Sequence, residues 1–160
     1  MVLYHIFDNY LLIVIISLNT ILIAALTSEV KLVNVIFRHG DRTPDSTYEM
    51  FPNDPYLNYT FYPTGFGQLT KEGKKREYSL GKFLRFRYND FLGSLYTPKR
   101  VVCHSSDVDR AKMSSQLVLA GLFPPKNIQR WNPFLNWQPI PISYLPANND
   151  NIILTINCPQ

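Results

Sequence analysis

The sequence predicts an α/β fold, with a mostly parallel sheet flanked by helices. Two stretches of the 160-residue chain follow one plan, in which an apolar strand leads into a polar loop and then into an amphipathic helix. In open α/β sheets, such units are parallel and right-handed, and ligands bind beyond the carboxyl ends of the strands. We therefore expect the two polar loops to lie at one edge of the sheet.

The first unit starts with a predicted strand over residues 31–37 and continues, after its polar loop, into an irregular stretch over residues 45–68. A structureless segment of this length in a compact domain is usually functional, so we expect it to border the entrance of a site. Thr70 is a good N-cap for a helix that should end near residues 90–93. Apolar residues keep helical spacing along this helix, at Leu80, Phe83, Leu84, Tyr88 and Phe91.

The second unit has a predicted strand over residues 100–103, a loop over residues 104–110 and a helix that two consecutive prolines should stop. Asp107 and Asp109 fit a structural role as acids near the positive end of that helix, which we favour over direct catalysis. One face of the helix is predicted to be core and holds Met113, Leu117, Val118, Gly121 and Leu122.

The two tryptophans and Cys103 are predicted to have structural roles in packing. Trp131 and Trp137 lie between prolines in an extended segment, and we interpret both as packing anchors. An oxidising compartment would permit the two cysteines, Cys103 and Cys158, to pair. The position of Cys103 at the end of an apolar strand argues against pairing, because a free cysteine there behaves as a small buried hydrophobe.

The N-terminal residues 1–27 are predicted to be a secretory signal peptide. Tyr10 to Leu26 form an almost continuous apolar run that ends in small residues, as a cleavable signal does. The run is near the lower limit for a membrane span of about 17–25 residues, so an uncleaved anchor is the alternative, and only then do we expect a membrane partner. Asn58 begins an N-glycosylation sequon in the irregular stretch, which agrees with a glycoprotein that is secreted, extracellular or lysosomal.

The composition indicates one modest globular domain. The chain has 46% hydrophobic residues and 14% aromatic residues, enough for a single core. Its formal net charge is +4, but the basic residues are dispersed along the sequence. The densest cluster, over residues 74–76, is interpreted as the solvated face of a helix. We therefore expect no nucleic-acid partner.

The polar loop over residues 38–44, Arg-His-Gly-Asp-Arg-Thr-Pro, has the chemistry of a phosphate site. The guanidinium groups of Arg38 and Arg42 supply forks of N–H donors that match phosphate oxygens. The imidazole of His39 between them can attack phosphorus and form a covalent intermediate. The structural alternative is a helix start with Thr43 as its N-cap and proline at the first helical position. That alternative gives no reason for the Arg-His pair.

This pattern, Arg-His-Gly-x-Arg-x-Pro after a short strand, resembles the signature of the histidine acid phosphatases, a branch of the phosphoglycerate-mutase-like superfamily. The resemblance implies hydrolysis of phosphate monoesters, small molecules or phosphoproteins, through a phosphohistidine on His39. It implies Arg38 and Arg42 as phosphate ligands and requires no metal or cofactor. The similarity, closest in texture to the secreted acid phosphatases of insects, runs from about Lys31 onward and includes residues 65–70, 106–110, 122–125 and 137–141.

Two departures from the family pattern bear on activity. Where the resemblance implies a third phosphate-binding arginine, this chain has His104, which when neutral offers one donor and no fixed charge. The alternative is that His104 is a polar residue with no role in the site.

The family's His-Asp pair, which includes the general acid, has no counterpart, so we expect residues 28–160 to be the N-terminal portion of an incomplete domain. Cys158 resembles a family cysteine with a distant downstream partner, and we expect it to be unpaired. The alternative function is a truncated, catalytically inactive secreted homologue that at most binds phosphate.

Overall fold

The computed structural model describes residues 14, 15, 17 and 29–151, and the chain divides into two compact units, residues 1–35 and 36–160. In the first unit, Val14, Ile15 and Ser17 are helical, and residues 29–35 form neither helix nor strand. The predicted signal peptide therefore lies almost wholly outside the described residues, as does Cys158. Within the described ranges, no helix is both long enough and apolar enough to cross a membrane.

The first predicted strand, over residues 31–37, is wrong for this structure. These residues have no strand assignment. Ile36 is fully exposed and Leu32 is 75% exposed. An apolar sequence becomes a strand only where a neighbouring strand accepts and donates its backbone hydrogen bonds, and that neighbour is not among the described residues.

The first helix, α2, spans Lys71–Arg87 and begins as the sequence predicts. The hydroxyl of its N-cap, Thr70, accepts a hydrogen bond from the backbone N–H of Gly73 at 3.0 Å, which satisfies one of the free donors of the first turn. A short helix, α3, follows over Asn89–Leu92 and ends at Gly93, whose φ of +70° suits glycine. Helical structure therefore ends near residues 90–93 as predicted, but the single predicted helix is broken at Tyr88, whose φ of −115° and ψ of 24° are not helical.

The second helix, α4, spans Asp109–Leu122 and stops before the two prolines, as predicted. Its predicted core face is only partly correct. Val118 and Gly121 are buried, but Met113 is only half-buried, and two serines and a leucine that were not predicted complete the buried face: Ser114, Ser115 and Leu119. Small and hydroxyl-bearing residues occupy this face because backbone segments approach it closely.

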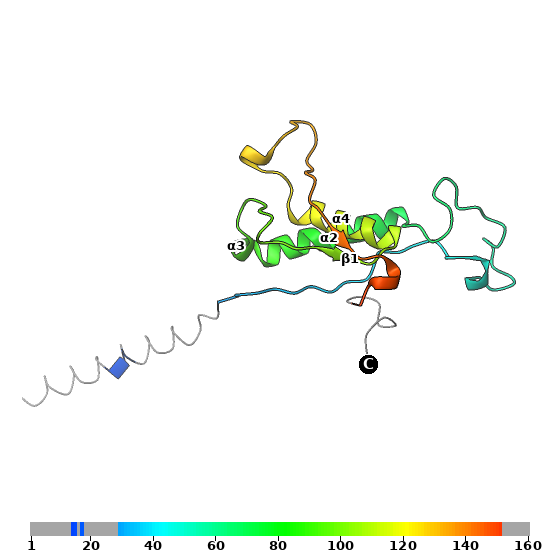
Figure 1. Ribbon diagram of the computed structural model, residues 1–160, viewed down its shortest axis with the longest axis horizontal. Helices are drawn as coiled ribbons and strands as arrows, with labels where there is room; N and C mark the ends of the chain where they lie inside the picture. Colours follow the sequence, from blue (N-terminus) through cyan, green and yellow to red (C-terminus); the bar gives the residue numbers. More distant parts are fainter. Residues whose placement is uncertain (1–13, 16, 18–28, 152–160) are drawn as a thin grey trace, which may run out of the picture. The chain divides into compact units, whose positions relative to one another are not determined.

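Helices α2 and α4 pack side by side at two glycines (Figure 1). A Cβ atom on Gly81 of α2 would overlap the carbonyl oxygen of Val118, and one on Gly121 of α4 would overlap the carbonyl oxygen of Tyr78. The two helix backbones can approach this closely only because both positions lack a side chain. Leu84, Val118, Leu119 and Phe123 form the apolar core around this contact, each no more than 8% exposed.

The sheet of the described residues is small and parallel. Strand β1, His104–Ser105, pairs with β2, Ser143–Tyr144, in the register His104 to Ser143 and Ser105 to Tyr144. The α/β class with parallel pairing is confirmed, although the second strand starts after the predicted residues 100–103. The shift follows from the pairing, because only Cys103 of the predicted stretch contacts β2, by accepting the Ser143 N–H at 2.9 Å.

The tryptophans are not buried packing anchors, contrary to the prediction. Trp131 is 58% exposed and Trp137 is 39% exposed, and the indole N–H of Trp131 donates to the carbonyl of Trp137 at 2.9 Å. Gln129 anchors this segment instead, by exchanging two hydrogen bonds with the backbone of Tyr96. The remaining elements are short 3-10 helices: η1 Thr47–Glu49, η2 Asn127–Gln129 and η3 Ala147–Asn149.

Replacing the glycine at the helix contact should destabilise the protein. At an exposed helix position, Gly→Ala gains about 1 kcal/mol from propensity. Gly81→Ala should instead lower the free energy of unfolding by about 1–3 kcal/mol, because the added methyl forces α2 away from Val118. Urea unfolding followed by circular dichroism measures the change, with Ser79→Ala on the exposed face of α2 as the control. A stabilised Gly81→Ala variant would contradict the close contact.

Candidate functional site

The polar loop over residues 38–44 is fixed to the start of α2 by backbone pairing. Arg42 and Leu69 form an antiparallel bridge. On either side of it, the Thr43 N–H donates to the Gln68 carbonyl and the Thr70 N–H donates to the Asp41 carbonyl, both at 2.9 Å. The irregular stretch over residues 45–68 is therefore a loop closed at its base by the polar loop, but none of its residues lines the cavity described below.

Two glycines let the polar loop lie directly on α2. A Cβ atom on Gly40 would come within 2.7 Å of the Gly73 carbonyl oxygen, and one on Gly73 would overlap the backbone of Asp41. From α4, the buried hydroxyl of Ser114 accepts the Gly40 N–H at 3.2 Å and donates to the Arg110 carbonyl at 2.7 Å. The backbone next to His39 is thus held by α2 and by α4.

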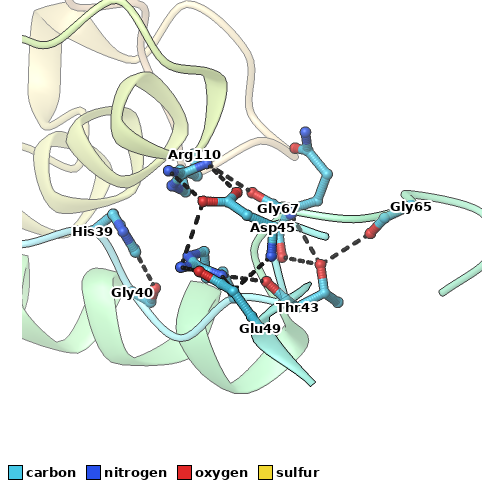
Figure 2. Close-up of polar contacts among 10 residues, drawn as sticks. His39, Gly40, Thr43, Asp45, Glu49, Gly65, Gly67 and Arg110 are labelled. Atoms are coloured by element: carbon cyan, nitrogen blue, oxygen red, sulfur yellow. Dashed lines mark hydrogen bonds and ion pairs between the residues drawn. The ribbon is translucent and has the colours of Figure 1, made fainter. Parts of the chain in front are cut away.

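The His39 side chain has a defined tautomer. Its Nδ1 lies 2.8 Å from the carbonyl oxygen of Gly40, and because a carbonyl can only accept, Nδ1 must carry the proton (Figure 2). In the neutral ring, the lone pair is then on Nε2. The ring borders a cavity of about 510 Å³, whose lining residues are Arg38, His39, Gly40, Asp41, Arg42, Arg76 and Glu77.

Arg38 and Arg42 both border this cavity, but their environments differ. Arg38 is exposed, and its guanidinium makes no ion pair within the described part of the chain. Arg42 is mostly buried and forks onto Glu49, with Nη1 at 2.8 Å and Nη2 at 2.9 Å from the two carboxylate oxygens. Nη1 also donates to the Thr43 carbonyl, and Nη2 lies 3.5 Å from Asp45. Arg38 is therefore the open guanidinium of the loop.

Arg42 belongs to an alternating ion network (Figure 2). Asp45 links it to Arg110 of α4, which donates to both Asp45 oxygens at 2.9 and 3.2 Å. The hydrogen bond from Arg42 lowers the pKa of Glu49 to about 2, helped by the backbone N–H of Asp45. The same hydrogen bond raises the pKa of Arg42. These ion pairs connect η1, the polar loop and α4.

The helix-start interpretation of Thr43 is wrong, because no helix begins at the following proline. The Thr43 hydroxyl donates to the Gly65 carbonyl at 2.9 Å and accepts the Gln68 N–H at 3.0 Å. It thereby closes the base of the 45–68 loop. Asn58, the sequon residue, is exposed on that loop.

His104 does not line the cavity. It lies in β1, and its Nδ1 is 3.0 Å from the Ser143 hydroxyl of β2. The two acids of the second loop are engaged at the start of α4, as the structural interpretation predicts: Asp107 pairs with Lys112, and Asp109 is the first residue of the helix. The structure brings the first loop's candidates together and leaves His104 outside their cavity.

Sequence reasoning missed two residues of the cavity, Arg76 and Glu77. Arg76 was assigned to a solvated helix face, but it borders the cavity and donates to Asp41 at 2.9 Å. Glu77 is only 4% exposed. Its spacing was the available signal: Gly73, Glu77 and Gly81 recur every four residues, so they share the helix face that the two glycines place against neighbouring backbone.

Known proteins resemble the chain over this whole region. Residues 29–160 match the family described as "Histidine phosphatase superfamily (branch 2)". Venom acid phosphatase Acph-1 of Apis mellifera is 56% identical over 137 residues, which cover 86% of this chain and 35% of the relative. Human prostatic acid phosphatase is 44% identical over 139 residues, with 86% and 35% coverage. Human lysosomal acid phosphatase is 46% identical over 123 residues, with 77% and 28% coverage.

The chain thus spans about a third of the length of these relatives. The family match covers the polar loop, both long helices and the parallel strand pair. The matched region includes the backbone at Gly40 that α4 holds through Ser114, and the cavity that His39, the exposed Arg38 and the ion-paired Arg42 line. On these grounds the chain belongs to branch 2 of the histidine phosphatase superfamily.

Proposed function

We propose that the protein is an acid phosphatase that hydrolyses phosphate monoesters through a phosphohistidine on His39. The observation that carries this proposal is the hydrogen bond from His39 Nδ1 to the Gly40 carbonyl. It fixes the ring and leaves the Nε2 lone pair available as the nucleophile, on a ring that borders a cavity shared with Arg38.

The reaction has two displacements at phosphorus. In the first, Nε2 of His39 forms the N–P bond while the ester P–O bond breaks, and the leaving alkoxide takes a proton from solvent to become the alcohol. In the second, water attacks phosphorus, the N–P bond breaks, the proton that water loses returns to solvent, and inorganic phosphate leaves. Arg38 stabilises the charge on the phosphoryl oxygens in both steps.

Arg42 is proposed as a second phosphate ligand that must first exchange partners. Its terminal nitrogens already serve Glu49, the Thr43 carbonyl and Asp45. Because the pKa of Glu49 is about 2, this carboxylate stays ionised throughout the moderately acidic range and keeps its hold on Arg42. Acid alone therefore does not free Arg42. A phosphate group must compete for its donors.

Small phosphate monoesters and phosphoproteins are the proposed substrates. The relatives are named for venom, prostate and lysosome, which supports a secreted, extracellular or lysosomal protein with residues 1–27 as signal peptide. Asn58 is the proposed glycosylation site, since it is exposed on the closed loop.

Removing the nucleophile should abolish turnover. His39→Ala should lower hydrolysis of a nitrophenyl phosphate by more than about 10³-fold, because this good leaving group still needs an attacking nitrogen. Steady-state kinetics and acid-quench trapping of the phosphoenzyme measure the loss. Lys75→Gln, an exposed change on α2 outside the cavity lining, is the control. Full turnover in His39→Ala would refute the assigned nucleophile.

A role for His104 as a third phosphate ligand stays a prediction. An arginine at this position adds a fixed charge and a fork of donors, so His104→Arg should tighten inhibition by vanadate about tenfold. Competitive inhibition measured at one pH tests the change. Unchanged inhibition would place residue 104 outside the phosphate site. Its position in β1, away from the cavity lining, would account for that result.

Glycosylation of Asn58 predicts a mass difference. Protein secreted from insect cells should lose the mass of one N-glycan on enzymatic deglycosylation, because Asn58 begins the single sequon of the sequence. Asn58→Gln should run at the deglycosylated mass before treatment. Identical masses for both proteins before treatment would show that the loop is not modified.

A further inference from the structure

Glu77 is a buried carboxyl group at the cavity of His39. It lies on α2 between Gly73 and Gly81, and it is 4% exposed. It lines the cavity together with Arg38 and His39. Its Oε2 atom is buried and finds no hydrogen-bond partner among the residues that the structure describes. A buried polar atom without a partner is costly, and the cost is larger for a charged carboxylate oxygen than for that of a neutral acid.

The surroundings of Glu77 favour its protonated form. Burial raises the pKa of this carboxyl, the negative charge of Asp41 raises it further, and Arg76 opposes the shift. Arg76 is itself held by Asp41 at 2.9 Å, so its charge is partly compensated. The neutral acid is therefore retained to higher pH than that of an exposed glutamate.

On the two segments packed against α2, the polar loop and α4, the other charged groups form ion pairs, border the cavity or, in the case of Asp109, lie at the start of α4. Arg42 is held by Glu49, and on α4, Arg110 is held by Asp45. Lys112 of α4 is held by Asp107, and Asp109 belongs to the first turn of that helix. Arg38 and His39 border the same cavity and would meet the same ligand.

We propose that protonated Glu77 donates a hydrogen bond to the tetrahedral oxyanion bound at His39, and that ionisation of Glu77 weakens anion binding as the pH rises. This role rests on the proposed phosphate chemistry of the cavity. A carboxylic acid offers one O–H donor, whereas every oxygen of the anion is an acceptor. Once ionised, the carboxylate has no donor and repels the anion.

The proposal implies that anion binding is coupled to one proton. Binding a tetrahedral anion stabilises the protonated state of Glu77, and by reciprocity protonation tightens binding. Above the pKa of Glu77 in the free protein, this single proton can lower the affinity up to about tenfold per pH unit. His39 and the arginines also affect the affinity for the anion. Their contributions are the same in the wild type and in a variant that changes Glu77 alone, so they cancel in the ratio of the two affinities.

Sulfate titrations of the full chain from pH 4 to 8 test the coupling. Sulfate is tetrahedral and keeps its charge over this range, so only protein groups titrate. In Glu77→Gln, the amide is a neutral donor at every pH. The ratio of its sulfate affinity to that of the wild type should be near one at pH 4 and should rise to about tenfold at neutral pH. Glu72→Gln, at an exposed position of α2, should keep a constant ratio.

Melting temperatures measured without anion test the titration of Glu77 separately from anion binding, which matters if Glu77→Gln alters the fold. The raised pKa means that folded wild type binds the Glu77 proton more tightly than the unfolded chain, so its stability falls as the pH rises above the unfolded value near 4.5. The melting temperature of Glu77→Gln relative to wild type should therefore increase with pH. A difference that does not vary with pH would show that Glu77 is not a perturbed acid and would overturn the proposal.

The proposed function and the role of Glu77 fail in different ways. A constant affinity ratio for Glu77→Gln, with turnover that still requires His39, would refute only the role of Glu77. Sulfate binding that is equally strong in Arg38→Gln would show that the cavity is not the anion site. That result would overturn both the phosphatase assignment and this inference, even if the melting data still reported a perturbed acid.

Discussion

Close approach of backbone to backbone is the constraint on which the rest of the structure depends. Gly40 and Gly73 allow the polar loop to lie on α2, and Gly81 and Gly121 allow α2 to lie on α4. Each contact lacks room for a methyl group, so the loop and both helices are packed at backbone-contact distance. The Ser114 hydroxyl then completes the assembly by binding the backbone N–H of Gly40.

The same geometry divides the charges of the site into open and compensated groups. Arg38 faces the cavity without an ion-pair partner in the described part of the chain, whereas Arg42 is neutralised by Glu49 and Asp45. Counting arginines would therefore overestimate the positive field available to a substrate. The compensated arginine has a structural function, because Asp45 also binds Arg110 and ties the polar loop to α4.

The sequence predicted features that depend on neighbouring residues and missed those that depend on distant ones. The Thr70 cap, the start of α2 and the Arg-His-Gly loop are encoded within a few residues, and parallel pairing follows from the order of the elements. The strand over residues 31–37 failed because its existence depends on a partner strand. Trp131 was interpreted as a packing anchor from its place between prolines, but its exposure is decided by tertiary packing that the local sequence does not specify.

Glu77 shows how the backbone constraint reaches the chemistry. Two glycines four residues to either side bring that face of α2 against neighbouring backbone, so a glutamate between them is buried whatever its own preference for water. Burial disfavours its charged form, and the adjacent polar loop contributes His39 to the lining of the same cavity. In the proposed role of Glu77, a helix-packing pattern thereby supplies a hydrogen-bond donor to the cavity, and this link is visible only when the spacing of the glycines and the cavity lining are considered together.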